Sequence, residues 1–153
     1  MELIFKNIDE KSELVKALNE YENLWNKDGE KIMEAFEEVG GGKFLVKNIQ
    51  VVVYEGISKS GYRDKPMMLR ASYSIEQKRS MFIHELGHRF IESKTIPKGV
   101  DVHEILNPII YKVWVKAYGE EFAKKAVEFE CSLNPRYASA WKKFADTFGS
   151  NSV

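Results

Sequence analysis

A chain of 153 residues is long enough for one hydrophobic core, and we expect residues 1–153 to form a single domain. Hydrophobic residues make up 44% of the chain and aromatic residues 12%, a composition that excludes an intrinsically disordered protein. Lys and Arg together number 23, as do Asp and Glu, so the net charge is zero and gives no sign of a surface for nucleic acid or anionic membranes.

The cysteine content and the hydropathy of the chain indicate the cellular compartment in which the protein is expected. Cys131 is the single cysteine, so no internal disulfide can form, as is typical of proteins in a reducing compartment. Residues 1–5 lack the charged segment and long apolar run of a signal peptide, and no stretch reaches the length of a membrane span. We therefore expect a cytoplasmic protein without a membrane partner, and the sequence leaves its oligomeric state open.

The first third of the chain is predicted to be helical. Apolar residues recur at helical spacing in residues 14–25 and again in residues 32–39. Asp28 and Gly29 interrupt the pattern, and the three glycines at 40–42 end it. Two helical stretches with a break between them are therefore expected, as a scaffold or as a cover for a cleft.

Strands are predicted in the middle of the chain. Residues 44–46 and 50–54 are rich in β-branched and aromatic residues, which favour strands. A polar loop with a glycine follows at residues 56–65, and residues 67–73 are predicted to form a further strand.

Residues 74–90 are predicted to form a helix. Ser74 followed by Gln77 matches a capping box, in which each side chain satisfies a free backbone N–H at the helix start. One face of this helix is apolar apart from a single arginine, and it carries Ile75, Arg79, Phe82, Ile83, Leu86 and Phe90.

The opposite face of this helix carries an H-E-x-x-H motif, His84 to His88. Histidines at positions i and i+4 direct both imidazoles to one point, where they can bind the same metal ion. A catalytic zinc ion keeps three protein ligands and leaves the fourth position to water. Glu85 points beside the histidines, where it can accept a proton from a metal-activated water. Gly87 costs about 1 kcal/mol inside a helix, which indicates a close approach by another backbone.

The motif His84-Glu85-Leu86-Gly87-His88 resembles the active-site helix of the zincin metallopeptidases, and the resemblance extends through the segment up to His103. It implies a zinc cofactor and an α+β, zincin-like fold, in which a small mixed sheet packs on the motif helix among several surrounding helices. It also implies an edge strand that binds the substrate backbone. The longer metzincin signature is absent, because Ile91 and Lys94 occupy its later positions. In size the chain is similar to small minimal zincins of the SprT-like or gluzincin type.

Further helices are predicted after the turn at Pro97. Asp101 followed by Glu104 matches a second capping box at the start of an apolar helix. Pro108 either kinks this helix or starts a new one. Two more helices are expected after Gly119 and after Asn134, and residues 149–153 are expected to fray.

The third metal ligand is predicted to be His103, with Glu104 as the alternative. His103 gives the three-histidine site that the resemblance to SprT-like proteins implies, and Glu104 gives the site of gluzincins. The capping pattern favours His103, because Glu104 already has a role at the helix start. Asp101 either orients a ligand histidine or only caps the helix. Weaker ligand candidates are Glu92 and Glu130.

The predicted activity is zinc-dependent hydrolysis of a peptide or protein substrate, with Glu85 as the general base. Tyr111 is a candidate to donate its hydroxyl to the oxyanion, with packing in the core as the alternative. Two other functions remain open. One is a non-catalytic, zinc-binding regulatory or interaction module. The other is a nucleic-acid-associated, SprT-like protease.

Overall fold

The computed structural model describes residues 1–7, 9–92 and 94–148, so the frayed end predicted for residues 149–153 lies outside the described part. The described residues combine helices with a small sheet, which confirms the α+β class. Within this part of the chain, no helix has the length and apolar composition that crossing a membrane requires. In chain order the elements are β1 (Glu2–Lys6), α1 (Ser12–Gly40), β2 (Asn48–Tyr54), β3 (Met67–Arg70), α2 (Ile75–Ile91), α3 (Val102–Tyr118), α4 (Glu120–Leu133) and α5 (Pro135–Phe148).

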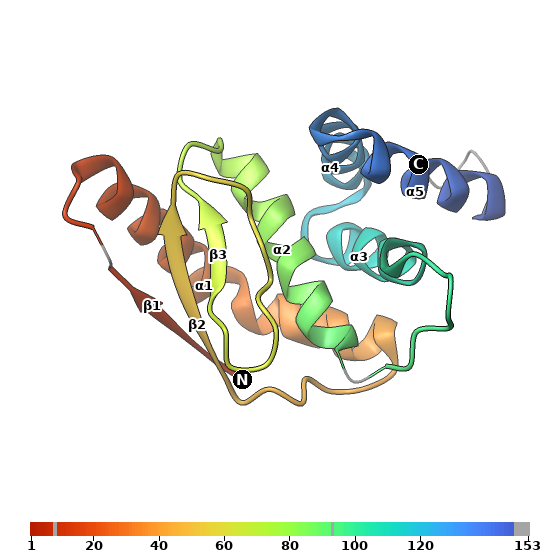
Figure 1. Cartoon of the computed structure of the whole chain (residues 1–153), viewed down its shortest axis with the longest axis horizontal. Helices are drawn as coiled ribbons and strands as arrows, with labels where there is room; N and C mark the ends of the chain where they lie inside the picture. The colour runs from red at the N-terminus through yellow and green to blue at the C-terminus, as the bar shows by residue number, and fades with distance from the viewer. Residues whose placement is uncertain (8, 93, 149–153) are drawn as a thin grey trace.

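Helix α2 occupies the middle of the molecule. Figure 1 shows the strands on one side of α2 and helices α3, α4 and α5 on the other. Helix α2 contacts β3 on the first side and α3 and α4 on the second, while α1 contacts the sheet, α2 and α3. The motif helix is therefore packed between two layers, and most of its residues are buried.

The three strands form a parallel sheet in the order β1-β2-β3, which corrects the predicted mixed sheet. Among the described residues, the antiparallel pairing is limited to one isolated bridge between Lys59 and Met68. Parallel neighbours need a long crossover connection. Helix α1 supplies it between β1 and β2, and residues 55–66 supply it between β2 and β3 without a helix.

Helix α1 runs unbroken through the interruption that the sequence predicted at Asp28 and Gly29. A Cβ atom on Gly29 would lie 2.7 Å from the indole ring of Trp25, so glycine leaves room for that ring. Asp28 is buried, and its carboxylate accepts a hydrogen bond of 2.8 Å from the hydroxyl of Tyr118 on α3. Asp28 and Gly29 therefore make packing and hydrogen-bond contacts from within one continuous helix, and the prediction of two separate helices was wrong.

The strand predictions are partly corrected. Strand β1 was not predicted, because it is short and its sequence shows no clear alternation of apolar and polar residues; in the structure Leu3 is its one buried residue. Strand β3 ends at Arg70, three residues before the predicted end. Residues 44–46 form no strand. The ring of Phe44 packs against Phe36 and Phe90 at centroid distances of 5.4 and 5.0 Å, so its apolar character serves the core.

Helix α2 begins at the predicted capping box. The hydroxyl of Ser74 accepts a hydrogen bond from the backbone N–H of Gln77, and the Gln77 side chain accepts one from the backbone N–H of Ser74. On the apolar face, Phe82 meets the rings of Tyr21 and Trp25 of α1 edge-on, each at a centroid distance of 5.9 Å. Burial of this face fixes which side of α2 the histidines occupy.

Gly87 lets α3 pack closely against α2. A Cβ atom at this position would lie 2.7 Å from Leu106 and 2.8 Å from Ile110, so the close neighbours are side chains of α3. The predicted approach by a backbone is corrected accordingly. Helix α3 continues through Pro108, so no new helix begins there.

We predict that Gly87→Val lowers the free energy of unfolding by about 1–3 kcal/mol, because the added carbons overpack a filled core. Chemical denaturation measures the change. Gly42→Val is the matched control, because a Cβ atom at Gly42 meets nothing within 4 Å. Equal stability of the two variants would contradict the close packing of α2 and α3.

Candidate metal centre

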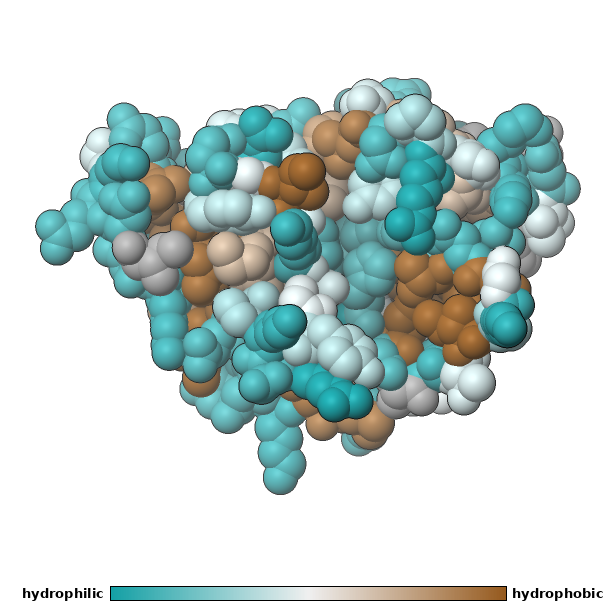
Figure 2. Space-filling view, in the orientation of Figure 1, coloured by the Kyte–Doolittle hydropathy of each residue, from teal (hydrophilic) through white to brown (hydrophobic). Residues whose placement is uncertain are grey.

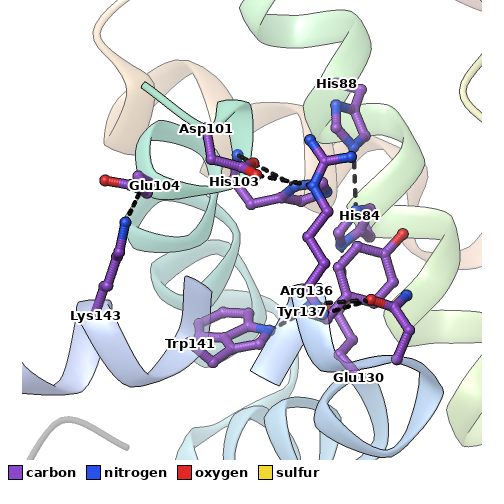
Figure 3. A network of polar contacts seen from close by, with 11 residues as sticks. His84, His88, Asp101, His103, Glu104, Glu130, Arg136, Tyr137, Trp141 and Lys143 are labelled. Carbon is purple, nitrogen blue, oxygen red and sulfur yellow. Dashed lines mark hydrogen bonds and ion pairs between the residues drawn. The ribbon is translucent and has the colours of Figure 1, made fainter. Parts of the chain in front are cut away.

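The structure brings the three predicted histidines together. His84 and His88 lie one turn apart on α2, and His103 faces them from the first turn of α3 (Figure 3). One ligand nitrogen of each lies within 4.8 Å of the other two, and the Nε2 atoms of His84 and His88 are 3.2 Å apart. His84 and His103 are buried, whereas His88 is partly exposed. The group therefore opens to solvent on the side of His88.

Two carboxylates orient two of the imidazoles. Nδ1 of His84 lies 2.7 Å from a carboxylate oxygen of Glu130, and Nδ1 of His103 lies 2.9 Å from Asp101. In each pair the Nδ1–H donates to the carboxylate, which leaves the lone pair of Nε2 free to bind a metal ion. Asp101 also accepts a hydrogen bond from the backbone N–H of His103. The predicted cap is confirmed, and the same carboxylate contacts the imidazole.

Helix α5 holds both carboxylates in place. The indole N–H of Trp141 donates to the second oxygen of Glu130 at 2.8 Å, inside the core. Arg136 donates to the second oxygen of Asp101, also at 2.8 Å, at the surface. Each carboxylate thus has one oxygen on a histidine and one on α5, as Figure 3 shows. The imidazole orientations consequently depend on the packing of the C-terminal helix.

The charges of the site favour neutral ligands. Burial lowers the pKa of His88, and the neighbouring His84 and His103 lower it further. Burial also lowers the pKa of His103. For His84, burial acts in the same direction, but the Glu130 carboxylate outweighs it and raises the pKa above its ordinary value. His88 and His103 are therefore neutral near pH 7, the form that binds metal.

Glu85 adds an acid–base group to the site. Its side chain is buried, and burial raises its pKa to about 7, against the lowering effect of His84 and with a further rise from Glu130. A carboxyl group with such a pKa exists in both protonation states at neutral pH. It can therefore accept a proton and return it.

Glu104, the alternative ligand, is engaged elsewhere. Its carboxylate lies 2.6 Å from Nζ of Lys143 on α5 and is not part of the histidine group (Figure 3). The carboxylate also makes no capping contact, so the second half of the predicted capping box is replaced by this ion pair. Because Glu104 lies one residue beyond His103 in α3, it points in another direction.

Tyr111 does not lie with the histidines. It is eight residues from His103, about 12 Å along the helix axis. Its ring packs against Trp141 and Phe144, so the core-packing alternative describes it. The tyrosine beside the imidazoles is Tyr137 of α5, with ring centroids 4.9 Å from His103 and 5.3 Å from His84. Tyr137, and not Tyr111, therefore contacts the imidazoles.

Sequence reasoning missed three residues of the site: Arg136, Tyr137 and Trp141. It ranked Glu130 only as a weak ligand, whereas Glu130 orients His84. The role of Glu130 could have been predicted from the sequence, because an acidic residue on the apolar side of a helix needs a polar partner in the core. The roles of Arg136 and Tyr137 could not have been predicted, because both residue types are equally suited to an exposed helix start.

The donor set fits a metal ion such as zinc. Nε2 of His103 is buried without a hydrogen-bond partner in the described part of the chain, so a bound ion would satisfy it. The lone pairs of His84 and His88 would repel at 3.2 Å unless a proton or a cation lay between them. Two nitrogens bound to one tetrahedral zinc ion at about 2.0–2.1 Å lie about 3.3–3.4 Å apart, close to that spacing.

Comparison of the chain with protein-family models, curated proteins and solved structures gives no significant match. The class of the site therefore follows from its own chemistry. It is a group of three histidines, of which His84 and His103 are buried and oriented by carboxylates, that can hold a metal ion.

We predict that His103→Ala lowers zinc affinity by more than the roughly 10–100-fold that loss of an orienting carboxylate costs, because it removes a ligand. Glu104→Ala should leave zinc affinity unchanged and remove only the ion pair to Lys143. Competition with a chromogenic chelator measures both affinities. Release of zinc by Glu104→Ala, with retention in His103→Ala, would reverse the assignment.

Proposed function

We propose that the chain is a zinc-dependent peptidase that hydrolyses a peptide or protein substrate with a metal-activated water and Glu85 as the general base. The observation that supports this most is the convergence of His84, His88 and His103 next to a buried glutamate. Holding a metal ion requires the histidines alone, so the glutamate is accounted for by chemistry at the site.

The histidines would hold the zinc ion through their Nε2 atoms, which the contacts of Nδ1 leave free in His84 and His103. When bound, zinc polarises a carbonyl group and lowers the pKa of a water molecule. The buried carboxylate of Glu130 and the partly exposed carboxylate of Asp101 keep the imidazoles of His84 and His103 in one tautomer and one orientation. A fixed ligand set is needed because catalysis depends on precise placement of the reacting groups.

Glu85 moves the protons of the proposed reaction. As a carboxylate it accepts a proton from the attacking water, and as a carboxylic acid it gives that proton to the leaving amine. Its raised pKa, at about 7, suits both steps near neutral pH. Its burial also keeps bulk water away from the proton that it carries.

Tyr137 is the proposed partner of the developing oxyanion. Its ring lies against His84 and His103, and Figure 3 shows its side chain projecting from α5 toward the histidines. Burial raises the pKa of Tyr137, and Glu85 and Glu130 raise it further, so the hydroxyl keeps its proton. A neutral hydroxyl is a hydrogen-bond donor suited to a negative oxygen.

A non-catalytic zinc module is the second candidate function. The burial of His84 and Glu85 favours it, because structural zinc sites are closed to solvent. The partial exposure of His88 favours the peptidase, because a substrate needs access to the site. The nucleic-acid-associated alternative receives no support from a net charge of zero.

We predict that Glu85→Gln abolishes hydrolysis of fluorescein-labelled casein and retains about one zinc ion per chain. The amide preserves the shape of the side chain but cannot accept the proton. Elemental analysis measures the zinc, and Glu128→Gln, on the exposed side of α4, is the control that keeps activity. Casein cleavage by Glu85→Gln at the normal rate would rule out Glu85 as the base. A wild-type protein that binds zinc and cleaves nothing would favour the non-catalytic module.

Tyr137→Phe is expected to lower kcat by about 10²–10³-fold with little change in KM, the effect of removing one donor to an oxyanion. Tyr111→Phe is the matched control and should leave kcat unchanged, because the Tyr111 hydroxyl is buried without a partner in the described structure. Steady-state kinetics on a peptide substrate separates the two. A larger loss in Tyr111→Phe than in Tyr137→Phe would restore the role first predicted for Tyr111.

A further inference from the structure

We infer that the hollow beside His88 is a subsite for an uncharged, apolar side chain of a peptide substrate, an inference that rests on the proposed peptidase function. The hollow has a volume of about 330 Å³, and His88 forms part of its lining. Because His88 is the most exposed of the three histidines, the hollow adjoins the open side of the candidate metal centre. A peptide bond placed at the histidines therefore brings a neighbouring side chain to this hollow.

The lining of the hollow presents more apolar than polar surface and comes from three parts of the chain. These are the loop between β2 and β3, the end of α2 with the residues that follow it, and the segment that leads into α3. Figure 2 shows apolar surface gathered over this segment and the start of α3. Apart from His88 and two charged residues, the lining consists of Ser60, Gly61, Tyr62, Ile91, Ile96 and Val102.

The wall from the β2–β3 loop is held rigidly by the motif helix. Arg89 is buried, and its guanidinium donates to the backbone carbonyls of Arg63, at 2.9 Å, and Lys65. Glu92 accepts a hydrogen bond of 2.8 Å from the backbone N–H of Arg63. Gly61 has φ +68°, and a Cβ atom there would lie 2.4 Å from a backbone oxygen, so no other residue fits. The hollow is thus preformed, as binding sites for small groups usually are.

The two charged residues of the lining are already paired. Glu92 bonds the loop backbone, as described above, and lies 3.5 Å from Arg89. The ammonium group of Lys94 donates to the carbonyl oxygen of Gly40 at 3.0 Å. Both side chains are held by protein groups, so a charged side chain entering the hollow would lose its hydration for less than a full ion pair. Burial of an apolar side chain in the hollow instead lowers the free energy of binding, so the hollow favours substrates with an apolar side chain at this position.

The test measures binding apart from hydrolysis. The zinc-loaded Glu85→Gln variant is titrated with blocked pentapeptides Ala-Ala-X-Ala-Ala, with X as Leu, Phe, Ala, Asp or Lys, and dissociation constants come from NMR shifts of backbone amides. We expect the Leu and Phe peptides to bind about tenfold more tightly than the Asp and Lys peptides, the gain from burying one large apolar side chain. The largest shifts should fall on Gly61, Tyr62 and Ile96.

Two variants of one loop provide a matched pair. Ile96 lines the hollow and is 37% exposed, whereas Val100 is 38% exposed and does not line it. In the Glu85→Gln background, Ile96→Asp should weaken binding of the Leu peptide about tenfold and improve binding of the Lys peptide. Val100→Asp should change neither by more than about twofold, as expected for a substitution outside the contact. Both should keep the zinc content of the parent.

Equal affinity for all five peptides, no binding at millimolar concentration, or an equal effect of the two Asp variants would overturn the subsite. Failure of the two proposals can be told apart. If the wild type cleaves casein but the peptides show no preference, the subsite alone is wrong. If Leu and Phe are preferred but nothing is cleaved, the hollow binds apolar side chains and the peptidase proposal is wrong.

Discussion

The hydrogen bond between Glu130 and His84 is the contact on which the arrangement of the site depends. Both side chains are fully buried, and an unpaired charge in that position would cost several kcal/mol. The structure meets this cost with two donors, because the carboxylate accepts from His84 on one oxygen and from Trp141 on the other. Helices α2, α4 and α5 are thereby joined at one point in the core.

Residues of α4 and α5 also take part in the site. Helix α2 supplies two imidazoles and α3 the third, whereas α4 supplies Glu130, which orients His84, and α5 supplies Arg136, which holds Asp101 in place. Arg136 and Tyr137 stand at the start of α5 and reach back to Asp101 and the imidazole rings. A site built this way is preorganised, because His84 and His103 are each fixed by packing and by a hydrogen bond to a carboxylate.

The middle and the C-terminal end of α2 have different surroundings. Its middle presents His84 and Glu85 to a closed interior, whereas its end carries His88, Arg89 and Glu92 toward the β2–β3 loop. Arg89 is buried, lies 3.5 Å from Glu92, and donates hydrogen bonds to the backbone carbonyls of Arg63 and Lys65. This contact ties a loop without a helix or strand of its own to the rigid helix. The open side of the site is shaped by that loop.

The sequence by itself determined the local features: the capped helix, its apolar face, and the pair His84 and His88 with Glu85 between them. These follow from spacings of three and four residues, which are fixed by the geometry of a helix. Only the tertiary structure decided that His103 joins them while its neighbour Glu104 turns to Lys143, and that Tyr137 rather than Tyr111 meets the imidazoles. It also decided that Asp28 and Gly29 stay within one helix and that the sheet is parallel. Such choices depend on how separate elements pack, and no short-range pattern in the chain encodes that packing.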